Sequence, residues 1–266
     1  MTEPYYKQHW IDIEPERLAA YDTILAFHPG LEPLLKPLEL KPGLRVLDVG
    51  SGPAHTTFEL ARRVAPGGKV TGVDINRDFV ARSNARAREQ KLNAEFVESG
   101  FPPLPFPEGS FDRVFSKNVL EYVDSAEQTI AEMARVTAPG GTVVVIDSDW
   151  DMLALDMPAG EARDRSDRII AAAKAIAIKE PRIGRRLFPL MRGAGLADVK
   201  VEVFAGADTV GRSVTMMRES QSRYARDSGQ IPARDIEQWL ADLESAVKRG
   251  TYLFVLPQFA ARGTKK

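Results

Sequence analysis

The stretch Val46-Leu47-Asp48-Val49-Gly50-Ser51-Gly52-Pro53-Ala54 decides the predicted fold. It joins a short apolar run to a turn with two glycines, and the amphipathic segment 56–64 follows the turn directly. Glycine allows positive φ and a close backbone approach to a ligand, and free N–H groups at a helix start bind a carboxylate or phosphate. This order of strand, glycine turn and helix predicts a ligand-binding βα turn. The alternative is a tight turn of the same shape that binds nothing.

The rest of the chain alternates short apolar runs with longer amphipathic segments, which is typical of βα units and a mostly parallel sheet. Strands are expected at 45–49, 69–74, 94–97, 113–116, 142–147 and 199–204. A last strand is expected at 252–259 despite Pro257, and the tail 262–266 is expected to fray. Helices are expected at 56–64, 77–91, 126–137, 161–178 and 184–193.

We expect the 266 residues to form one α/β domain with additions. Residues 1–40 are predicted to be a helical lead-in that acts as a lid, and residues 41–150 the cofactor-binding core. Residues 151–266 are predicted to be the substrate-side half, with a helical cap around 209–249 that shapes the substrate pocket.

Composition excludes several classes of function. The 36 basic residues nearly balance the 37 acidic ones, so the chain lacks the basic field that holds a nucleic acid backbone. It contains no cysteine, which excludes disulfides, thiolate catalysis and Cys-ligated metals. The N-terminus is polar and no apolar run reaches about 18 residues, so we expect a cytoplasmic protein without a signal peptide or membrane span.

The glycine turn does not fit a dinucleotide site, because the third glycine of Gly-x-Gly-x-x-Gly would fall at His55. Asp74 follows the second predicted strand, where a carboxylate can accept hydrogen bonds from both ribose hydroxyls of a nucleoside. This position suits NAD and S-adenosylmethionine equally. The alternative for Asp74 is a helix N-cap or a solvated turn residue.

From 44 to 147 the sequence resembles the class I S-adenosylmethionine-dependent methyltransferases. The likeness is to the type 11 group, which includes ubiquinone- and menaquinone-biosynthesis enzymes. Its motifs are Asp48 to Gly52, Asp74, Leu104-Pro105-Phe106-Pro107, Gly109-Ser110-Phe111-Asp112, Val119-Leu120-Glu121-Tyr122-Val123 and Ala134 to Gly141. A fainter likeness continues through 184–187 and 195–199 to the final strand. The resemblance implies a Rossmann-like, doubly wound sheet of seven strands, mostly parallel, with an antiparallel last strand.

The same resemblance implies S-adenosylmethionine as methyl donor and S-adenosylhomocysteine as product. Backbone groups of Gly50, Ser51 and Gly52 would line the methionine end, with Asp48 on its ammonium and Asn118 facing the methionine. Asp74, followed by Ile75, would hold the ribose, and Gly100 and Phe101 would cover the adenine. Two positions depart from the family pattern: Gly100 stands where an acidic residue is usual, and Ala54 stands for the third glycine.

Methyl transfer needs a desolvated, in-line approach of the nucleophile to the sulfonium methyl, so a catalytic base is optional. Candidates for a base are His55, His28, His9, Asp147 and Asp149, with His55 first because it follows the glycine turn. For each single histidine, a capping or surface role is the more frequent one. We expect a small aromatic or otherwise apolar acceptor, methylated at O, N or C.

Aromatic residues supply the candidate substrate contacts. Tyr5, Tyr6 and Trp10 would close over the site, or would only anchor a helix; Tyr122 and Trp150 would form apolar walls near strand ends. Three carboxylates flank Trp150, at 147, 149 and 151, and we expect solvated loop acids and no metal.

Two other functions stay open at this point. One is an NAD-dependent oxidoreductase, disfavoured by His55 and by the lack of a Tyr-x-x-x-Lys pair. The other is a non-catalytic nucleotide-binding or regulatory module of the same fold. The expected partner is a small-molecule acceptor, and the protein is expected to be a monomer or a homodimer.

Overall fold

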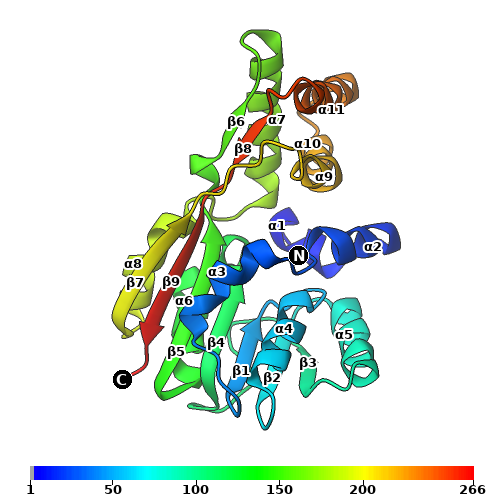
Figure 1. Cartoon of the computed structure of the whole chain (residues 1–266). Coiled ribbons are helices and arrows are strands. Elements are labelled where there is room, and N and C mark those ends of the chain that lie inside the picture. Colours follow the sequence, from blue (N-terminus) through cyan, green and yellow to red (C-terminus); the bar gives the residue numbers. More distant parts are fainter. Residues whose placement is uncertain (1–2) are drawn as a thin grey trace.

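The computed structural model describes residues 3–266. The lead-in is helical, as predicted, and consists of α1 (Tyr5–Ile11), α2 (Pro15–Ile24), α3 (Glu32–Leu35) and two 3₁₀ turns around α3. Pro15 occupies the first position of α2, where its fixed φ suits a helix and its missing N–H costs nothing. Figure 1 shows α1 and α2 beside one end of the sheet, beneath a second group of helices.

The main sheet has seven strands in the order β3-β2-β1-β4-β5-β9-β7. Its members are β1 (Arg45–Val49), β2 (Lys69–Asp74), β3 (Ala94–Glu98), β4 (Phe111–Lys117), β5 (Thr137–Ser148), β7 (Ala197–Phe204) and β9 (Gln258–Thr264). The last strand, β9, is antiparallel to both its neighbours, and the pairs from β3 to β5 are parallel. This confirms the predicted doubly wound α/β sheet. The strand order reverses between β1 and β4, which is where open α/β sheets bind ligands.

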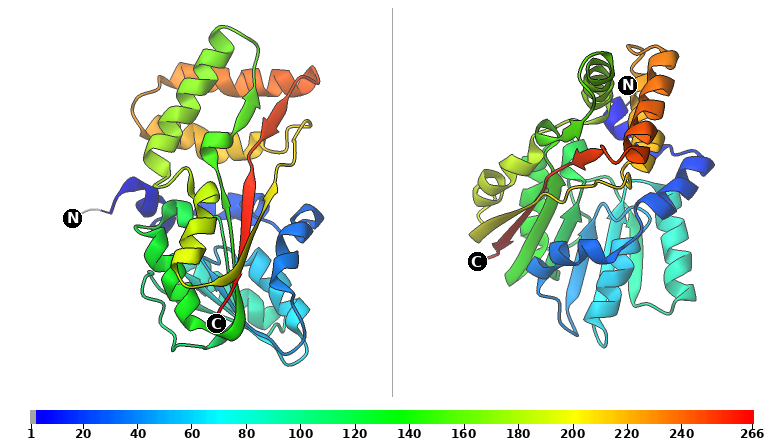
Figure 2. Two further views of the ribbon diagram at one scale, coloured as in Figure 1. Left: turned by 90° about the vertical axis from the view of Figure 1, so that its left-hand side faces the viewer. Right: turned by 45° about the horizontal axis from the view of Figure 1, so that its top comes forward.

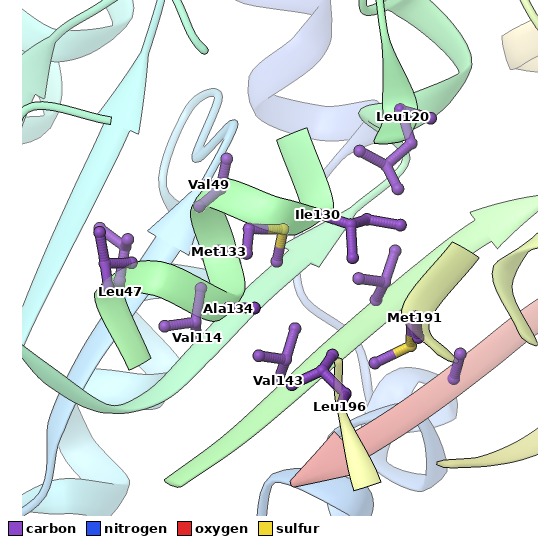
Figure 3. Close-up of a cluster of buried hydrophobic side chains, with 14 of the residues drawn as sticks. Leu47, Val49, Val114, Leu120, Ile130, Met133, Ala134, Val143, Met191 and Leu196 are labelled. Carbon is purple, nitrogen blue, oxygen red and sulfur yellow. The ribbon is translucent and has the colours of Figure 1, made fainter. Parts of the chain in front are cut away.

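Helices cover both faces of the sheet (Figures 1 and 2). They are α4 (His55–Val64) and α5 (Arg77–Glu89) on the face shared with α3, and α6 (Ala126–Val136) and α8 (Ile183–Gly193) on the other. Side chains alternate along a strand, so Leu47 packs toward α6 and α8 while Val46 packs toward α4. Figure 3 shows the hydrophobic core between the sheet and the helices α6 and α8, which includes Met133 of α6 and Met191 of α8.

A second group of elements stands over the carboxyl ends of the strands (Figures 1 and 2). It contains a two-stranded sheet, β6 (Ala154–Asp156) with β8 (Leu253–Val255), and the helices α7 (Glu161–Ala177), α9 (Val214–Met216), α10 (Ser222–Asp227) and α11 (Ala233–Lys248). A π-helical turn at Met217–Gln221 joins α9 to α10. These helices have their own core, in which Trp239 is fully buried and donates Nε1–H to Ser166 Oγ at 3.1 Å. Within residues 3–266, no helix is both long and apolar enough to cross a membrane.

The prediction of a single last strand at 252–259 is wrong. The chain forms β8 against β6, breaks at Pro257, which has no N–H for a ladder, and enters the main sheet as β9. The predicted fraying of 262–266 is also wrong for most of the tail. Gly263 of β9 pairs with Val143 of β5, and the backbone N–H of Lys265 donates to the carbonyl oxygen of Gly141 at 2.9 Å. This polar segment is ordered because β9 pairs with β5 on one side and with β7 on the other.

Candidate functional site

A cavity of about 340 Å³ lies at the carboxyl ends of the strands. Its walls come from the turns after β1, β2, β4 and β5, from α1 and α2, and from the helices above them. A volume of this size lies at the lower end of the range for small-molecule sites. Because the ends of β1 and β4 both line it, the cavity lies where the strand order reverses.

The glycine turn forms the floor of the cavity. Gly50 has φ +76°, and a Cβ there would lie 2.3 Å from Val119 Cγ2, so a side chain cannot be accommodated. Gly52 has φ +51°, and no atom lies within 4 Å of its Cβ position. Ala54 adopts the left-handed conformation at φ +65° as the N-cap of α4. The chain thus exposes bare backbone to the cavity at Gly50 and Gly52, as the ligand-turn hypothesis requires.

Asp74, at the end of β2, holds this turn in place. Its Oδ2 accepts a hydrogen bond from Gly52 N at 2.7 Å, and its Oδ1 accepts one from Asn76 N at 2.9 Å. Each carboxylate oxygen keeps a lone pair for a further donor, so the buried side chain fits a ligand with hydroxyl groups. The N-cap of α5 is Asn76, whose Oδ1 accepts from Phe79 N at 2.8 Å, so the N-cap alternative for Asp74 is wrong. Ile75 also lines the cavity.

Asp48, in β1 just before the turn, also lines the cavity. Its Oδ2 accepts a hydrogen bond from Thr57 Oγ1 of α4 at 2.6 Å. Burial raises the pKa of Asp48 to about 7. A cationic group bound nearby would favour the ionised form. The residue fits the predicted contact with an ammonium group.

Two polar atoms of the predicted cofactor set have no partner within residues 3–266. They are Ser51 Oγ and Asn118 Oδ1, both buried and both on residues that line the cavity. Asn118 has φ +54° and follows β4 directly. Buried polar atoms are normally hydrogen-bonded, so these two indicate a polar ligand in this half of the cavity.

The adenine contacts are only partly brought together. Phe101 lines the cavity, whereas Gly100 is exposed and does not. Its Cβ position meets no atom within 4 Å, so an acidic side chain in its place would have room. The sequence-based assignment of Gly100 to the site is therefore not supported by its position.

Sequence reasoning missed four charged residues of the cavity as site residues: Lys7, Lys117, Glu121 and Asp124. Lys117 ends β4 and lines the cavity; burial lowers its pKa. Glu121 is 2% exposed, and its Oε2 accepts a hydrogen bond from Trp150 Nε1. Burial and then the neighbouring Asp147 raise the pKa of Glu121 well above its usual value. Lys117 and Glu121 lie at and just after the carboxyl end of β4, and this position in the sequence was the signal that could have identified them.

The acids around Trp150 are not solvated loop residues, so that prediction is wrong for two of the three. Asp147 is fully buried and accepts from Val119 N at 3.3 Å and Leu120 N at 2.9 Å. Asp149 is fully buried and accepts two hydrogen bonds from the guanidinium group of Arg185, at 2.6 and 2.7 Å. Only Asp151 is exposed, and it pairs with Lys174 and Arg182. Neither Asp147 nor Asp149 lines the cavity.

The aromatic candidates divide into two groups. Trp10, Tyr122 and Trp150 line the upper half of the cavity, and the rings of Trp10 and Tyr122 meet edge to face at 5.2 Å. Tyr5 and Tyr6 do not line it. Their hydroxyl groups donate to Asp227 at 2.5 Å and to Asp124 at 2.9 Å, which ties α1 to the elements above and below. Tyr5 and Tyr6 thus anchor α1.

The histidines are also separated. His28 caps a 3₁₀ turn by accepting from Gly30 N, outside the cavity. His9 is buried among aromatic rings, and burial lowers its pKa to about 4. His55 alone lines the cavity, with Nε2 3.4 Å from Asp22 Oδ1. Burial, with Arg86 nearby, lowers the pKa of His55.

Among residues 3–266, no group of three or more His, Asp or Glu side chains is arranged to hold a metal ion. The carboxyl groups near the cavity instead accept hydrogen bonds from backbone N–H groups and from the side chains of Thr57, Trp150 and Arg185. The arrangement offers a polar floor for a nucleoside and an amino acid, and an aromatic upper half.

Comparison with known families agrees with this geometry. Residues 40–182, just over half of the chain, match the family described as the methyltransferase domain. The chain belongs to this family. The match confirms the class I S-adenosylmethionine-dependent methyltransferase inferred from the motifs, and with it the methyl donor. The NAD-dependent oxidoreductase alternative is thereby set aside.

Proteins related in sequence match parts of this chain. A 37.1 kDa protein in transposon TN4556 of Streptomyces fradiae is 33% identical over 79% of this chain and 60% of its own. The demethylmenaquinone methyltransferase of Lactococcus lactis is 35% identical over 45% of this chain and 48% of its own. The chain thus spans 60% or less of the length of these relatives.

Solved structures share the fold at low identity. The YcgJ protein of Bacillus subtilis gives a TM-score of 0.61 at 19% identity, over 90% of this chain and 99% of that one. Phosphoethanolamine N-methyltransferase 2 of Haemonchus contortus, solved with S-adenosylmethionine, gives 0.61 at 18% identity, over 100% of this chain and 60% of that one.

Proposed function

We propose that this methyltransferase transfers a methyl group from S-adenosylmethionine to a small, ring-containing or otherwise apolar acceptor. The observation that carries the proposal is one continuous cavity with two unlike halves. Its floor is Gly50 to Gly52 with two carboxylates, and its upper half is mainly aromatic and aliphatic. The aromatic and aliphatic residues of the upper half are Trp10, Tyr122, Trp150, Met216, Tyr224 and Leu256; the polar side chains of Lys7, Glu121, Asp124, Ser220, Gln221 and Gln258 also line the cavity.

The residues of the floor fit the methyl donor. Asp74 would hold the ribose hydroxyls, Gly50 to Gly52 and Asp48 the methionine end, and Phe101 the adenine side. When bound, the donor supplies a methyl group on a positively charged sulfur that leaves as a neutral thioether. The chain's own contribution is to orient the acceptor and to exclude water.

The lid residues serve that exclusion. Asn76 Nδ2 donates to the carbonyl groups of Trp10 at 3.0 Å and Ile11 at 3.1 Å, which holds the end of α1 against the core. On the other side, Tyr5 binds Asp227 of α10. With both sides held, Trp10 closes the upper half of the cavity.

Methyl transfer can be tested without knowing the acceptor. The protein is incubated with S-adenosylmethionine carrying a deuterated methyl group and a panel of small phenols, amines and carbon acids. Mass spectrometry should then find S-adenosylhomocysteine together with one acceptor that has gained the labelled methyl group. The Asp74→Ala variant is the matched control and should form less of both. A wild-type protein that binds S-adenosylmethionine but methylates no compound would favour the non-catalytic module.

A further inference from the structure

We infer that the acceptor presents its nucleophile as a hydroxyl group on an apolar ring, and that Glu121 accepts a hydrogen bond, and then the proton, from this hydroxyl. The inference rests on the proposed function and specifies its substrate class. It assigns to Glu121 a direct contact with the acceptor.

Glu121 is held on the cavity wall from three directions. It lies in the 3₁₀ turn Leu120–Tyr122, whose first N–H groups donate to Asp147 at the end of β5. Its backbone carbonyl accepts from Lys179 N at 2.9 Å. Its carboxyl group accepts from Trp150 Nε1. The side chain is thus fixed in position before any ligand enters.

A buried carboxyl group of this kind is costly. The side chains that hydrogen-bond to it are the neutral Trp150 and Tyr122, and the charge of Lys117 at the end of β4 also lowers its pKa. Asp147 of β5 acts in the opposite direction and raises it. A buried carboxyl group without a cationic partner costs stability when it is ionised, and carboxyl groups held in this state concentrate at functional sites.

The other charged groups of the upper wall are already paired. Lys7 Nζ of α1 lies 3.2 Å from Asp124 Oδ2, which leaves Glu121 as the acid available to a ligand. Two further wall atoms have no partner in the described chain: Gln258 Oε1, an acceptor, and Trp10 Nε1, a donor. A hydroxyl group can donate one hydrogen bond and accept another while a lone pair attacks the methyl carbon, whereas an amine that uses its single lone pair in the attack can only donate. The wall therefore matches a hydroxyl group.

The proton balance is simple. When the hydroxyl oxygen bonds to the methyl carbon, the bond from that carbon to sulfur breaks and its electron pair stays on the sulfur, which becomes a neutral thioether. The O–H bond also breaks, and the oxygen keeps that electron pair. The proton passes to the Glu121 carboxylate and leaves to solvent after product release. A base whose pKa lies above that of an ordinary carboxylate is better matched to a hydroxyl group at neutral pH.

The test uses the full chain saturated with S-adenosylhomocysteine and three probes of one ring size: 2-naphthol, 2-naphthylamine and 2-methoxynaphthalene. Calorimetry should show that 2-naphthol binds at least about 10-fold more tightly than 2-methoxynaphthalene, the scale of a hydrogen bond to a charged group. This preference should grow as the pH rises from about 6 to about 9, because deprotonated Glu121 is the stronger acceptor.

The Glu121→Gln variant keeps an oxygen for Trp150 and should fold. It should bind S-adenosylhomocysteine as the wild type does. Its preference for 2-naphthol over 2-methoxynaphthalene should fall below about 3-fold and should no longer depend on pH. Glu127→Gln is the control, because Glu127 is an exposed acid of α6 that does not line the cavity, and this variant should retain both.

Several results would overturn the inference. They are equal binding of the three probes, no binding of any of them, tightest binding of 2-naphthylamine, or a preference for 2-naphthol that survives in Glu121→Gln. A pH-independent preference in the wild type alone would do the same, whatever the folding of the variant. Failure of the proposed function gives another outcome, which is no binding of S-adenosylmethionine or S-adenosylhomocysteine.

Discussion

The carboxylate of Asp74 accepts a hydrogen bond from the backbone N–H of Gly52 at 2.7 Å, so the acid that ends β2 fixes the turn that follows β1. The two residues are 22 positions apart in the sequence and meet because β1 and β2 are parallel neighbours. One side chain thus both shapes the glycine turn and lines the cavity.

Replacing Asp74 should weaken binding of the methyl donor. We expect Asp74→Ala to lose roughly 1.5 to 3 kcal/mol of affinity for S-adenosylmethionine, the scale of hydrogen bonds to a charged group. Asp74→Asn should lose less, because an amide oxygen can still accept from Gly52. Calorimetry measures both, and Asp78→Ala, an exposed acid of the next helix, is the control. Unchanged affinity in a folded Asp74→Ala variant would remove Asp74 from the site.

Stability of the unliganded protein should fall as the pH rises. Burial raises the pKa of Asp48 to about 7, above its value in the unfolded chain. The folded state therefore binds this proton more tightly. The resulting stability is complete below about pH 4 and is lost as the pH rises through 7, at about 1.4 kcal/mol for each pH unit.

Urea unfolding of Asp48→Asn checks this sign. The variant should show a flatter decline than the wild type between about pH 5 and about pH 8. Some decline will remain, because burial also raises the pKa of Asp147 to about 7. An identical slope in both proteins would show that Asp48 is ionised throughout.

Trp150→Phe should separate acceptor binding from cofactor binding. The substitution removes the Nε1–H that Glu121 accepts, and leaving a buried group unsatisfied costs about 1 to 3 kcal/mol of stability. Acceptor binding should weaken, with affinity for S-adenosylhomocysteine nearly intact. Trp239→Phe also loses a buried indole hydrogen bond, but away from the cavity, and should affect stability alone. Equal loss of both ligands in Trp150→Phe would place Trp150 in the cofactor half.

No histidine should prove indispensable. His28 caps a turn, His9 lies among aromatic rings, and only His55 reaches the cavity. Each folded His→Gln variant should keep kcat within about 100-fold of the wild type, the lower end of what a true base supplies. Steady-state rates with the identified acceptor measure this. A loss of about 10⁴-fold in His55→Gln, with cofactor affinity unchanged, would make His55 the base.

The parallel half of the fold could be predicted because its signals are local. Apolar runs and the glycine turn predicted β1, β2 and the helix α4 between them to within a few residues. The antiparallel strand β9 could not be placed, because Arg262 to Thr264 are ordered by β5 and β7, which lie far away in the sequence.

The site was predictable on the cofactor side for the same reason. Asp48, Gly50, Gly52 and Asp74 lie at strand ends in one short region, and the structure gathers them around the cavity. The upper half depends on partners distant in the sequence. Asp149 is buried against Arg185, and Glu121 meets Trp150, contacts that no local pattern encodes.

The most direct test of the account is a crystal structure of the protein with S-adenosylhomocysteine. The account predicts the ribose hydroxyl groups on the Asp74 carboxylate, the homocysteine moiety along Gly50 to Gly52, and the sulfur facing the aromatic half of the cavity. S-adenosylhomocysteine bound elsewhere, or lying with its sulfur turned away from Trp10 and Glu121, would contradict it.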